Sequence, residues 1–335
     1  MPAIAVADAL RAEGAQVSFV GGERAEAELV PAAGYPLDAI AVEGISRANP
    51  IKAMRAAAKA ALALRAAGRI LRERQADAVL GGGGYVAGPV GLAAVLRRVP
   101  LVLTEADSHL GLSNRLLAGR AARVCLAFPI RGRNADRYVV TGRPVPPRDA
   151  ERGPARAALG IRAEERCLLV FGGSLGAHSI NHAALAAFAD APYRVLHVAG
   201  RRDFGELAAP GPHYDLRDYV TPFGQALAAA DLAVARAGGS IFELAQYGVP
   251  AVLVPYPHAT ADHQTANARW MQVGGAAVVI RDDALTPERL RAGVDAILLD
   301  PDRLAAMAAA SKRLARPDAA QEVAHAVLAA AGGSG

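Results

Sequence analysis

The sequence predicts an α/β protein made of two Rossmann-like domains facing a cleft. Strand-like runs rich in β-branched residues alternate with helical runs over most of the 335 residues, and this alternation is typical of parallel sheets covered by helices on both faces. A proline-rich segment over residues 141–154 has no apolar period and is typical of an interdomain linker. A second strand–helix series starts after it, at Arg166. We expect domains over residues 1–145 and 146–311, and a C-terminal helical segment, 312–333, that crosses back to the first domain.

The expected elements follow in order along the chain. Residues 2–13 have an apolar face and a proline in the first turn, which predicts a helix. The last stretch, 301–331, is predicted to be helical with a break near Pro317. Strands are expected at 15–22, 76–84, 99–107, 122–128 and 137–142, and then at 167–174, 193–200, 218–223, 232–239, 250–257 and 276–282.

The composition indicates a globular protein, because 53% of the residues are hydrophobic and 21% are charged. The apolar runs are too short and too often broken by glycine to span a bilayer. No charged and apolar leader with a cleavage site opens the chain, so we do not expect export. Cys125 and Cys167 each lie in an apolar strand-like run, which predicts buried thiols in a cytosolic protein.

The net charge of +5 is concentrated between residues 47 and 74, where eight basic residues accompany a single acid, Glu73. The segment is predicted to be an amphipathic helix. Such a face is either solvated or rests on anionic lipid headgroups. Nucleic acid is disfavoured as a partner, because no aromatic-interleaved basic groove accompanies the charge.

Three glycine-rich turns join a predicted strand to a predicted helix, at residues 81–84, 172–176 and 238–239. Glycine lets backbone N–H groups and a helix N-terminus approach an anion closely, so the three turns together predict a phosphate-bearing ligand. The motifs for ATP hydrolysis and for nicotinamide binding do not occur. His258, Asp262 and His263 lie close in sequence but lack a fourth ligand, so we expect no metal site and no cofactor.

Six motifs then occur in a fixed order: "GGYVAGP", "TEADSHLGLSNR", "TGRPV", "FGGSLGA", "RAGGSIFEL" and "HATADHQTANA". In this order the chain resembles, over nearly its whole length, the MurG-type family of two-domain GT-B glycosyltransferases. The resemblance implies transfer of N-acetylglucosamine from UDP-GlcNAc to lipid I, with inversion and without a metal, to form lipid II in peptidoglycan synthesis. It also implies a peripheral enzyme at the cytoplasmic face of the cell membrane that serves cell-wall biogenesis, cell shape and cell division. Its membrane-facing patch on the first domain would include residues 47–74.

The resemblance assigns the donor UDP-GlcNAc to the second domain. Ser174 would meet the donor in its glycine loop. Glu243 would accept the two ribose O–H groups, which suits a carboxylate, and Gln264 would contact the sugar hydroxyls. The other donor-binding candidates are Gly173, Gly238, Gly239, Ser240 and, from the first domain, Asp107.

The resemblance assigns the acceptor to the first domain. The glycine turn at residues 81–84 would receive the acceptor diphosphate. The acceptor-binding candidates are Gly83, Gly84, Tyr85, Gly88 and Asn114.

The chain departs from the family pattern at several positions. Asp107 stands where the family has an asparagine, and its charge would repel a phosphate close to it. Pro146 takes the place of an arginine, for which Arg143 or Arg148 would have to substitute. The loop "RAGGSIFEL" is one residue shorter than usual, which shifts Ser240 and Ile241 by one place in the match.

The largest departure concerns the catalytic base. Family members carry a strand and a "GGTGGHxxPA" loop whose histidine is the expected base, whereas Pro2 of this chain aligns after that loop. We expect that the sequence starts late, from a misassigned start codon. Glu105 is the candidate base that the motifs leave, although a carboxylate needs a raised pKa for this role. His109 matches a variable position and is interpreted as a surface or packing residue.

Alternative functions stay open at this point. The chain could be another GT-B enzyme that uses a UDP-sugar, either a glycolipid glycosyltransferase or a sugar-nucleotide epimerase. It could also be a truncated protein that binds a UDP-sugar without catalysis.

Overall fold

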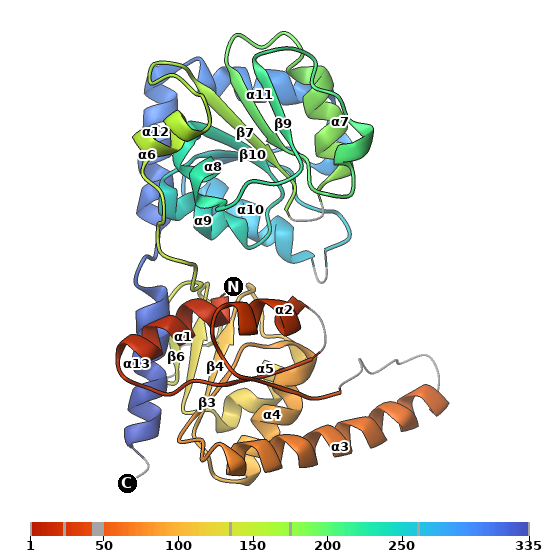
Figure 1. Ribbon diagram of the computed structural model, residues 1–335, viewed down its shortest axis with the longest axis vertical. Coiled ribbons are helices and arrows are strands. Elements are labelled where there is room, and N and C mark those ends of the chain that lie inside the picture. Colours follow the sequence, from red (N-terminus) through yellow and green to blue (C-terminus); the bar gives the residue numbers. More distant parts are fainter. Residues whose placement is uncertain are drawn as a thin grey trace. The chain divides into compact units, whose positions relative to one another are not determined.

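The computed structural model describes residues 2–22, 25–41, 50–133, 136–173, 176–259 and 262–333; the side chains of residues 25, 50–58 and 60 are outside this description. The chain forms two compact units (Figure 1). The N-terminal unit comprises Met1–Pro146 and Arg316–Gly335, and the C-terminal unit comprises Pro147–Ala315. Within the described ranges, no helix is both long enough and apolar enough to cross a membrane.

The N-terminal unit contains two parallel sheets. Strands β3, β4, β5 and β6 form one sheet in that order, and β1 pairs with β2 in the other. Its elements are α1 (Pro2–Ala12), β1 (Phe19–Gly21), α2 (Ala25–Ala32), β2 (Leu37–Ala39), α3 (Pro50–Glu73), β3 (Val79–Gly81), α4 (Gly84–Leu96), β4 (Leu101–Glu105), α5 (Leu112–Leu117), η1 (Ala118–Arg120), β5 (Arg123–Leu126), β6 (Tyr138–Val140) and α13 (Ala319–Gly332).

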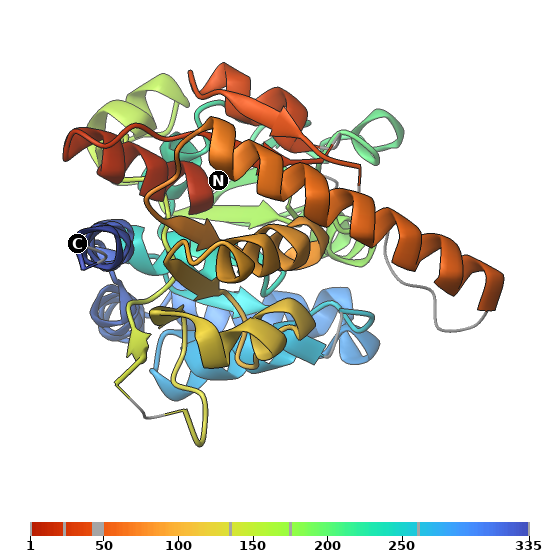
Figure 2. The same ribbon diagram turned by 90° about the horizontal axis from the view of Figure 1, so that it is seen from below.

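Both faces of the four-stranded sheet are covered by helices. Leu101 and Leu103 of β4 pack into a cluster with residues of α3 and α4, which lie side by side in both views (Figures 1 and 2). Val102, between them, packs with residues of α1 and α13 on the other face. Since successive side chains of a strand point to opposite faces, this alternation buries Leu101, Val102 and Leu103 of β4 from both sides of the sheet.

The C-terminal unit contains one six-stranded parallel sheet in the order β12-β11-β10-β7-β8-β9. The chain runs from β7 outward to β8 and β9, and then returns to the other side of β7 as β10. Its elements are α6 (Arg152–Ala158), β7 (Cys167–Phe171), α7 (His178–Ala187), β8 (Arg194–Val198), β9 (Tyr214–Arg217), α8 (Gly224–Ala229), β10 (Leu232–Ala235), α9 (Ser240–Tyr247), β11 (Ala251–Leu253), α10 (His263–Val273), β12 (Ala277–Val279), α11 (Pro287–Leu298) and α12 (Pro301–Leu314).

Most of the expected elements are confirmed. The first helix is present as α1, and the break near Pro317 separates α12, which ends at Leu314, from α13, which begins at Ala319. The strand predicted at 218–223 is wrong, because the strand in this region is β9, at Tyr214–Arg217. Tyr214 is buried in β9, and Arg217 pairs with Asp215. The strand was missed because two of its four residues are charged. The short strand β2 was not predicted.

The two cysteines are buried and are not joined by a disulfide, as the sequence predicted. Burial raises the pKa of the Cys125 thiol to about 11. Burial also raises the pKa of Cys167 to about 12, and the nearby Asp231 carboxylate adds to that shift. Both thiols therefore stay protonated and unreactive near neutral pH.

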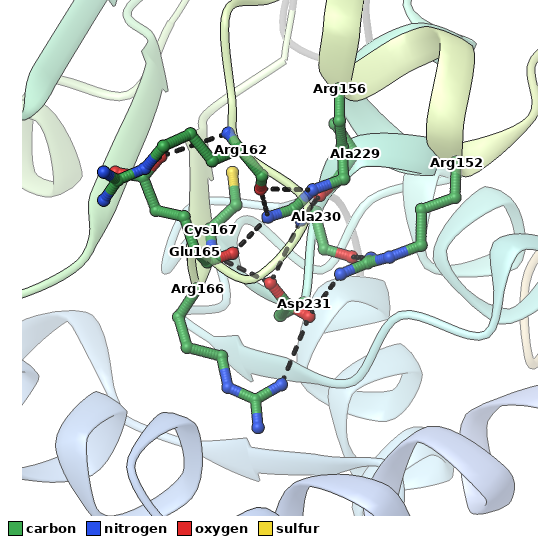
Figure 3. Close-up of polar contacts among 9 residues, drawn as sticks. All are labelled: Arg152, Arg156, Arg162, Glu165, Arg166, Cys167, Ala229, Ala230 and Asp231. Carbon is green, nitrogen blue, oxygen red and sulfur yellow. Dashed lines mark hydrogen bonds and ion pairs between the residues drawn. The ribbon is translucent and has the colours of Figure 1, made fainter.

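A buried ionic cluster anchors α6 to the amino ends of β7 and β10 (Figure 3). The Asp231 carboxylate accepts hydrogen bonds from the Arg152 guanidinium at 2.7 Å and from the Cys167 backbone N–H at 2.8 Å. Arg156 lies 3.4 Å from the same carboxylate and is only 3% exposed. Its guanidinium also donates to the backbone carbonyls of Ala229, Arg162 and Glu165. Since a buried guanidinium must be paired, Asp231 stabilises the whole cluster.

We expect Asp231→Asn to lower the free energy of unfolding by about 2–3 kcal/mol, because it removes the charge that compensates buried Arg156. Urea denaturation followed by circular dichroism measures the change. Asp136→Asn is the control, since Asp136 is exposed and its carboxylate has no partner within the described residues. Equal stability of the Asp231 variant and the control would show that the cluster contributes little.

Candidate functional site

Two of the glycine turns lie next to each other at the carboxyl edge of the C-terminal sheet. One turn follows β7 and the other follows β10, and these two strands are hydrogen-bonded neighbours. The strand order reverses between them. In doubly wound sheets, ligands bind outside the carboxyl ends of the strands at this switch point.

The turn after β7 can be formed only with glycine at its key positions. Gly173 and Gly176 have φ angles of 94° and 81°, which lie in the left-handed region. A Cβ atom on Gly172 would lie 2.3 Å from the Ala177 backbone nitrogen. One on Gly176 would lie 2.1 Å from the Ala199 carbonyl oxygen. The chain therefore folds tightly before α7, while Ser174, the predicted donor contact, lies outside the described residues.

A buried polar network supports the turn after β7. The Asn181 side chain of α7 donates to the Ala199 carbonyl at 3.0 Å and to the Asp203 carboxylate at 2.9 Å. His197 on β8 lies 3.0 Å from the Asn181 amide oxygen, and its other ring nitrogen lies 2.8 Å from the Tyr214 hydroxyl. Burial lowers the pKa of His197 to about 4, so the ring is neutral at physiological pH. His197 therefore has a structural role without a positive charge, and the Asp203 carboxylate, whose pKa is lowered chiefly by its hydrogen bond to Arg202, is the charged member of the network.

The turn after β10 leads directly into α9. Gly239 precedes the helix, Ser240 is its first residue, and the half-buried Glu243 lies in its first turn. A Cβ atom on Gly238 would lie 3.8 Å from the Gln264 side-chain nitrogen, which places Gln264 beside the turn. The Gln264 amide oxygen accepts the Tyr256 backbone N–H at 3.0 Å. The amide nitrogen therefore remains as the group that faces Gly238.

Asn267 supports the same turn through a hydrogen bond to the backbone just before it. It is 3% exposed, and its side chain donates to the Ala237 carbonyl at 3.0 Å. Asn267 belongs to the "HQTANA" motif, but no role for it was predicted from the sequence. Its position one helical turn after Gln264 was the available signal, because residues three apart share a helix face.

Arg236 connects the segments around both turns, and sequence reasoning missed it. Its largely buried guanidinium donates to the Asp282 carboxylate at 2.6 Å and to the Ser179 hydroxyl of α7 at 2.8 Å. It also donates to the carbonyls of Val254 and Pro255, which follow β11. Ser179 donates in turn to Asp282 at 2.7 Å. An arginine directly after a buried strand and before a glycine pair was the signal in the sequence.

In the N-terminal unit, the first glycine turn connects β3 to α4. Gly83 and Gly84 both have φ angles of 79°, and Gly84 begins the helix. Tyr85 is 65% exposed on the first turn of α4. Gly88 lies close to α5, since a Cβ atom there would be 3.3 Å from the Ser113 hydroxyl.

Glu105 and Asn114 form a buried pair beside this turn. Both oxygens of the Glu105 carboxylate accept hydrogen bonds: one from the Asp107 backbone N–H, the other from Gly111 N–H at 2.8 Å and the Asn114 side chain at 2.9 Å. Asn114 also donates to the Thr104 carbonyl. Its amide oxygen is buried and has no hydrogen-bond partner among the described residues. A carboxylate held by three donors is suited to fixing the loop that follows β4.

The remaining sequence-predicted residues are spread over the two units. Asp107 is half-buried, and its carboxylate has no hydrogen bond or ion pair to the described residues. His109 is exposed. Arg148, a suggested substitute for the missing arginine, lies over the Tyr247 ring at 5.0 Å, near the amino edge of the C-terminal sheet. It is therefore on the edge opposite the glycine turns.

Metal-ligating side chains do not gather anywhere in the part of the chain that the structure describes. Asp262 instead accepts a hydrogen bond from Thr265 at 2.6 Å at the start of α10.

Comparison with known proteins places this geometry in a family. Residues 1–126 match the glycosyltransferase family 28 N-terminal domain, and residues 167–323 match the glycosyltransferase family 28 C-terminal domain. The chain is 40% identical to the UDP-N-acetylglucosamine--N-acetylmuramyl-(pentapeptide) pyrophosphoryl-undecaprenol N-acetylglucosamine transferase of Moorella thermoacetica, over 98% of this chain and 94% of that protein. The chain is 42% identical to the enzyme of the same name from Salinibacter ruber, over 98% of this chain and 93% of that protein.

A solved structure agrees with these relatives. The crystal structure of Acinetobacter baumannii MurG superposes with a TM-score of 0.78 at 31% identity, and covers 98% of this chain and 95% of that one. The chain therefore belongs to the MurG family of GT-B glycosyltransferases.

Proposed function

We propose that the chain transfers N-acetylglucosamine from UDP-GlcNAc to undecaprenyl-diphospho-muramoylpentapeptide (lipid I), as the names of its relatives state for those proteins. The observation that carries the proposal is the pair of glycine turns at the switch point between β7 and β10. Adjacent helix N-termini at such a point suit a diphosphate, because their N–H groups and dipoles favour negative charge.

In this proposal the donor is held by the C-terminal unit. The turns before α7 and α9 bind the diphosphate, and their N–H groups stabilise the charge that develops on the leaving UDP. Glu243, in the first turn of α9, accepts the ribose hydroxyls. The Gln264 amide nitrogen, which lies beside Gly238, donates to a hydroxyl of the sugar.

The N-terminal unit binds the acceptor in the same proposal. The turn at Gly83 and Gly84 and the N-terminus of α4 receive the acceptor diphosphate. Glu105 acts as a positioning residue, since its two oxygens hold the loop from Asp107 to Gly111 and the Asn114 side chain of α5.

A transfer assay with the full chain, labelled UDP-GlcNAc and lipid I tests the proposed function, and we expect labelled lipid II as the product. Labelling of diacylglycerol instead would indicate a glycolipid glycosyltransferase. Release of free sugar without an acceptor would indicate an epimerase-type reaction, and binding without turnover would indicate a non-catalytic protein. Each of these three results contradicts the proposal.

In the same assay, we expect Gln264→Ala to raise the KM for UDP-GlcNAc about tenfold, because it removes one hydrogen bond to the sugar. The affinity for UDP, measured by calorimetry, should not change. Gln272→Ala is the matched control, since Gln272 is exposed on the same helix. An equal loss of UDP affinity would mean that Gln264 shapes the site and does not contact the sugar.

We further propose that helices α3, α4 and α5 rest on the membrane. Arg65, Arg69 and Arg72 of α3 are exposed, and Arg69 lies 3.8 Å from Glu73. Lys59 is exposed as well, whereas Arg74 pairs with Asp38 at 2.9 Å; the part of the predicted basic segment at 47–58 lies outside the described side chains. Helix α4 packs against both α3 and α5. Large apolar side chains are exposed on all three helices, namely Leu62, Tyr85, Leu92, Leu96, Leu112 and Leu116.

Apolar side chains with neighbouring arginines are typical of a surface that binds anionic lipid. We expect the double variant L96S/L116S to bind phosphatidylglycerol-containing vesicles at least about tenfold more weakly than the wild type, because two exposed leucines lose their lipid contact. Vesicle sedimentation measures this. Leu299→Ser is the control, since Leu299 is exposed to a similar extent on the C-terminal unit. Equal binding of all three proteins would contradict the proposed surface.

A further inference from the structure

A cavity of about 360 Å³ lies at the amino edge of the six-stranded sheet, within the C-terminal unit. Its walls come from the segment that leads into α6, the residues just before β7 and β10, the ends of α8 and α9, and α12. The glycine turns of the proposed donor site lie at the carboxyl edge of the same sheet. The cavity is thus separate from the donor site, and its volume is at the lower end of the range of small-molecule sites.

The charged side chains that line the cavity are three arginines and one acid, namely Arg148, Arg152, Arg166 and Asp231. Three guanidinium groups surround the Asp231 carboxylate (Figure 3), those of Arg152 at 2.7 Å, Arg156 at 3.4 Å and Arg166 at 3.6 Å. Among the described residues, no other acid forms an ion pair with these arginines or with Arg148. Since one carboxylate carries a single negative charge, the positive charge around the cavity is in excess.

Arg148 and Arg166 keep N–H donors that a ligand can use. The distance of 3.6 Å between Arg166 and Asp231 is too long for a hydrogen bond, and the guanidinium has no other partner within the described residues. The Arg148 guanidinium lies over the Tyr247 ring at 5.0 Å, and it has no hydrogen bond or ion pair to any described residue. Arg152, by contrast, already donates to the Asp231 carboxylate and to a backbone carbonyl.

The other walls of the cavity are largely apolar and include Leu227, Val249, Pro301 and Leu304. Guanidinium groups match phosphate oxygens in geometry, and a phosphate monoester carries a charge of about −1.5 to −2 at pH 7, which offsets an excess of positive charge. Apolar walls accommodate an organic substituent. We propose that the cavity binds a small soluble phosphate monoester, whose phosphate group accepts hydrogen bonds from Arg148 and Arg166 and whose organic part contacts the apolar walls.

Calorimetric titration of the full chain with phenyl phosphate tests the proposal, with UDP at a saturating concentration so that the proposed donor site is filled. We expect the double variant R148Q/R166Q to bind phenyl phosphate about tenfold or more weakly than the wild type, because two charged hydrogen-bond donors are lost. Asp231 retains Arg152 and Arg156 in this variant, so the Tm should not fall.

The control is a second double variant with the same loss of charge, R289Q/R313Q. Both of its arginines are exposed on helices of the C-terminal unit, and neither lines the cavity. Ala305→Phe adds a ring at the wall of the cavity and leaves the arginines in place, so it should also weaken the binding of phenyl phosphate. Inorganic phosphate should bind the wild type more weakly than phenyl phosphate, because it has no apolar part.

Phenyl phosphate bound at the glycine turn of the N-terminal unit would not be displaced by changes at positions 148, 166 or 305, so their effect reports on the cavity. The proposal is overturned if the wild type does not bind phenyl phosphate in the presence of UDP, or if R148Q/R166Q binds it as tightly as the control. Equal affinity of the wild type for inorganic phosphate and phenyl phosphate would also contradict it, because the apolar walls would then take no part in binding.

Discussion

The guanidinium of Arg236 joins four segments at the carboxyl edge of the C-terminal sheet. It extends from the end of β10, and it reaches the first turn of α7, the carbonyls after β11 and Asp282 after β12. A charged group that is largely buried is unfavourable unless its donors are matched. Its acceptors are therefore held at fixed positions, and the helices that begin at the two glycine turns are held with them.

Each glycine turn is also held by an asparagine side chain of its own. Before α7, Gly172 and Gly176 allow a backbone approach that no side chain permits, and Asn181 fixes the opposing Ala199 carbonyl. Before α9, the Asn267 side chain holds the turn by donating a hydrogen bond to the Ala237 carbonyl. The amino edge of the same sheet has a different function, since the Asp231 cluster there ties the strands to α6. Within this unit, the Asp231 cluster and the proposed donor site therefore lie at opposite edges of the sheet.

The sequence predicted those features that depend on local pattern. Helix α1, the buried cysteines, the glycine turns and the break near Pro317 follow from periodicity, apolar runs and the properties of glycine and proline. Strand β9 was misplaced, because its four residues include an Asp–Arg pair that is polar in sequence but lies within a sheet. The supporting roles of Arg236 and Asn267 were missed, since they arise from contacts between segments far apart in the chain. The position of Arg148 could not be predicted for the same reason, because its contact is with Tyr247, which lies far from it in the sequence.

If Arg236 holds both glycine turns in the form that binds a nucleoside diphosphate, its replacement must weaken the binding of UDP. Calorimetric measurement of UDP affinity in Arg236→Met tests it, with Arg236→Lys as the variant that retains the charge and Arg289→Met as the control. We expect UDP binding to weaken about tenfold or more in Arg236→Met and less in Arg236→Lys, with unchanged far-UV circular dichroism. Wild-type UDP affinity in a folded Arg236→Met protein would contradict the account.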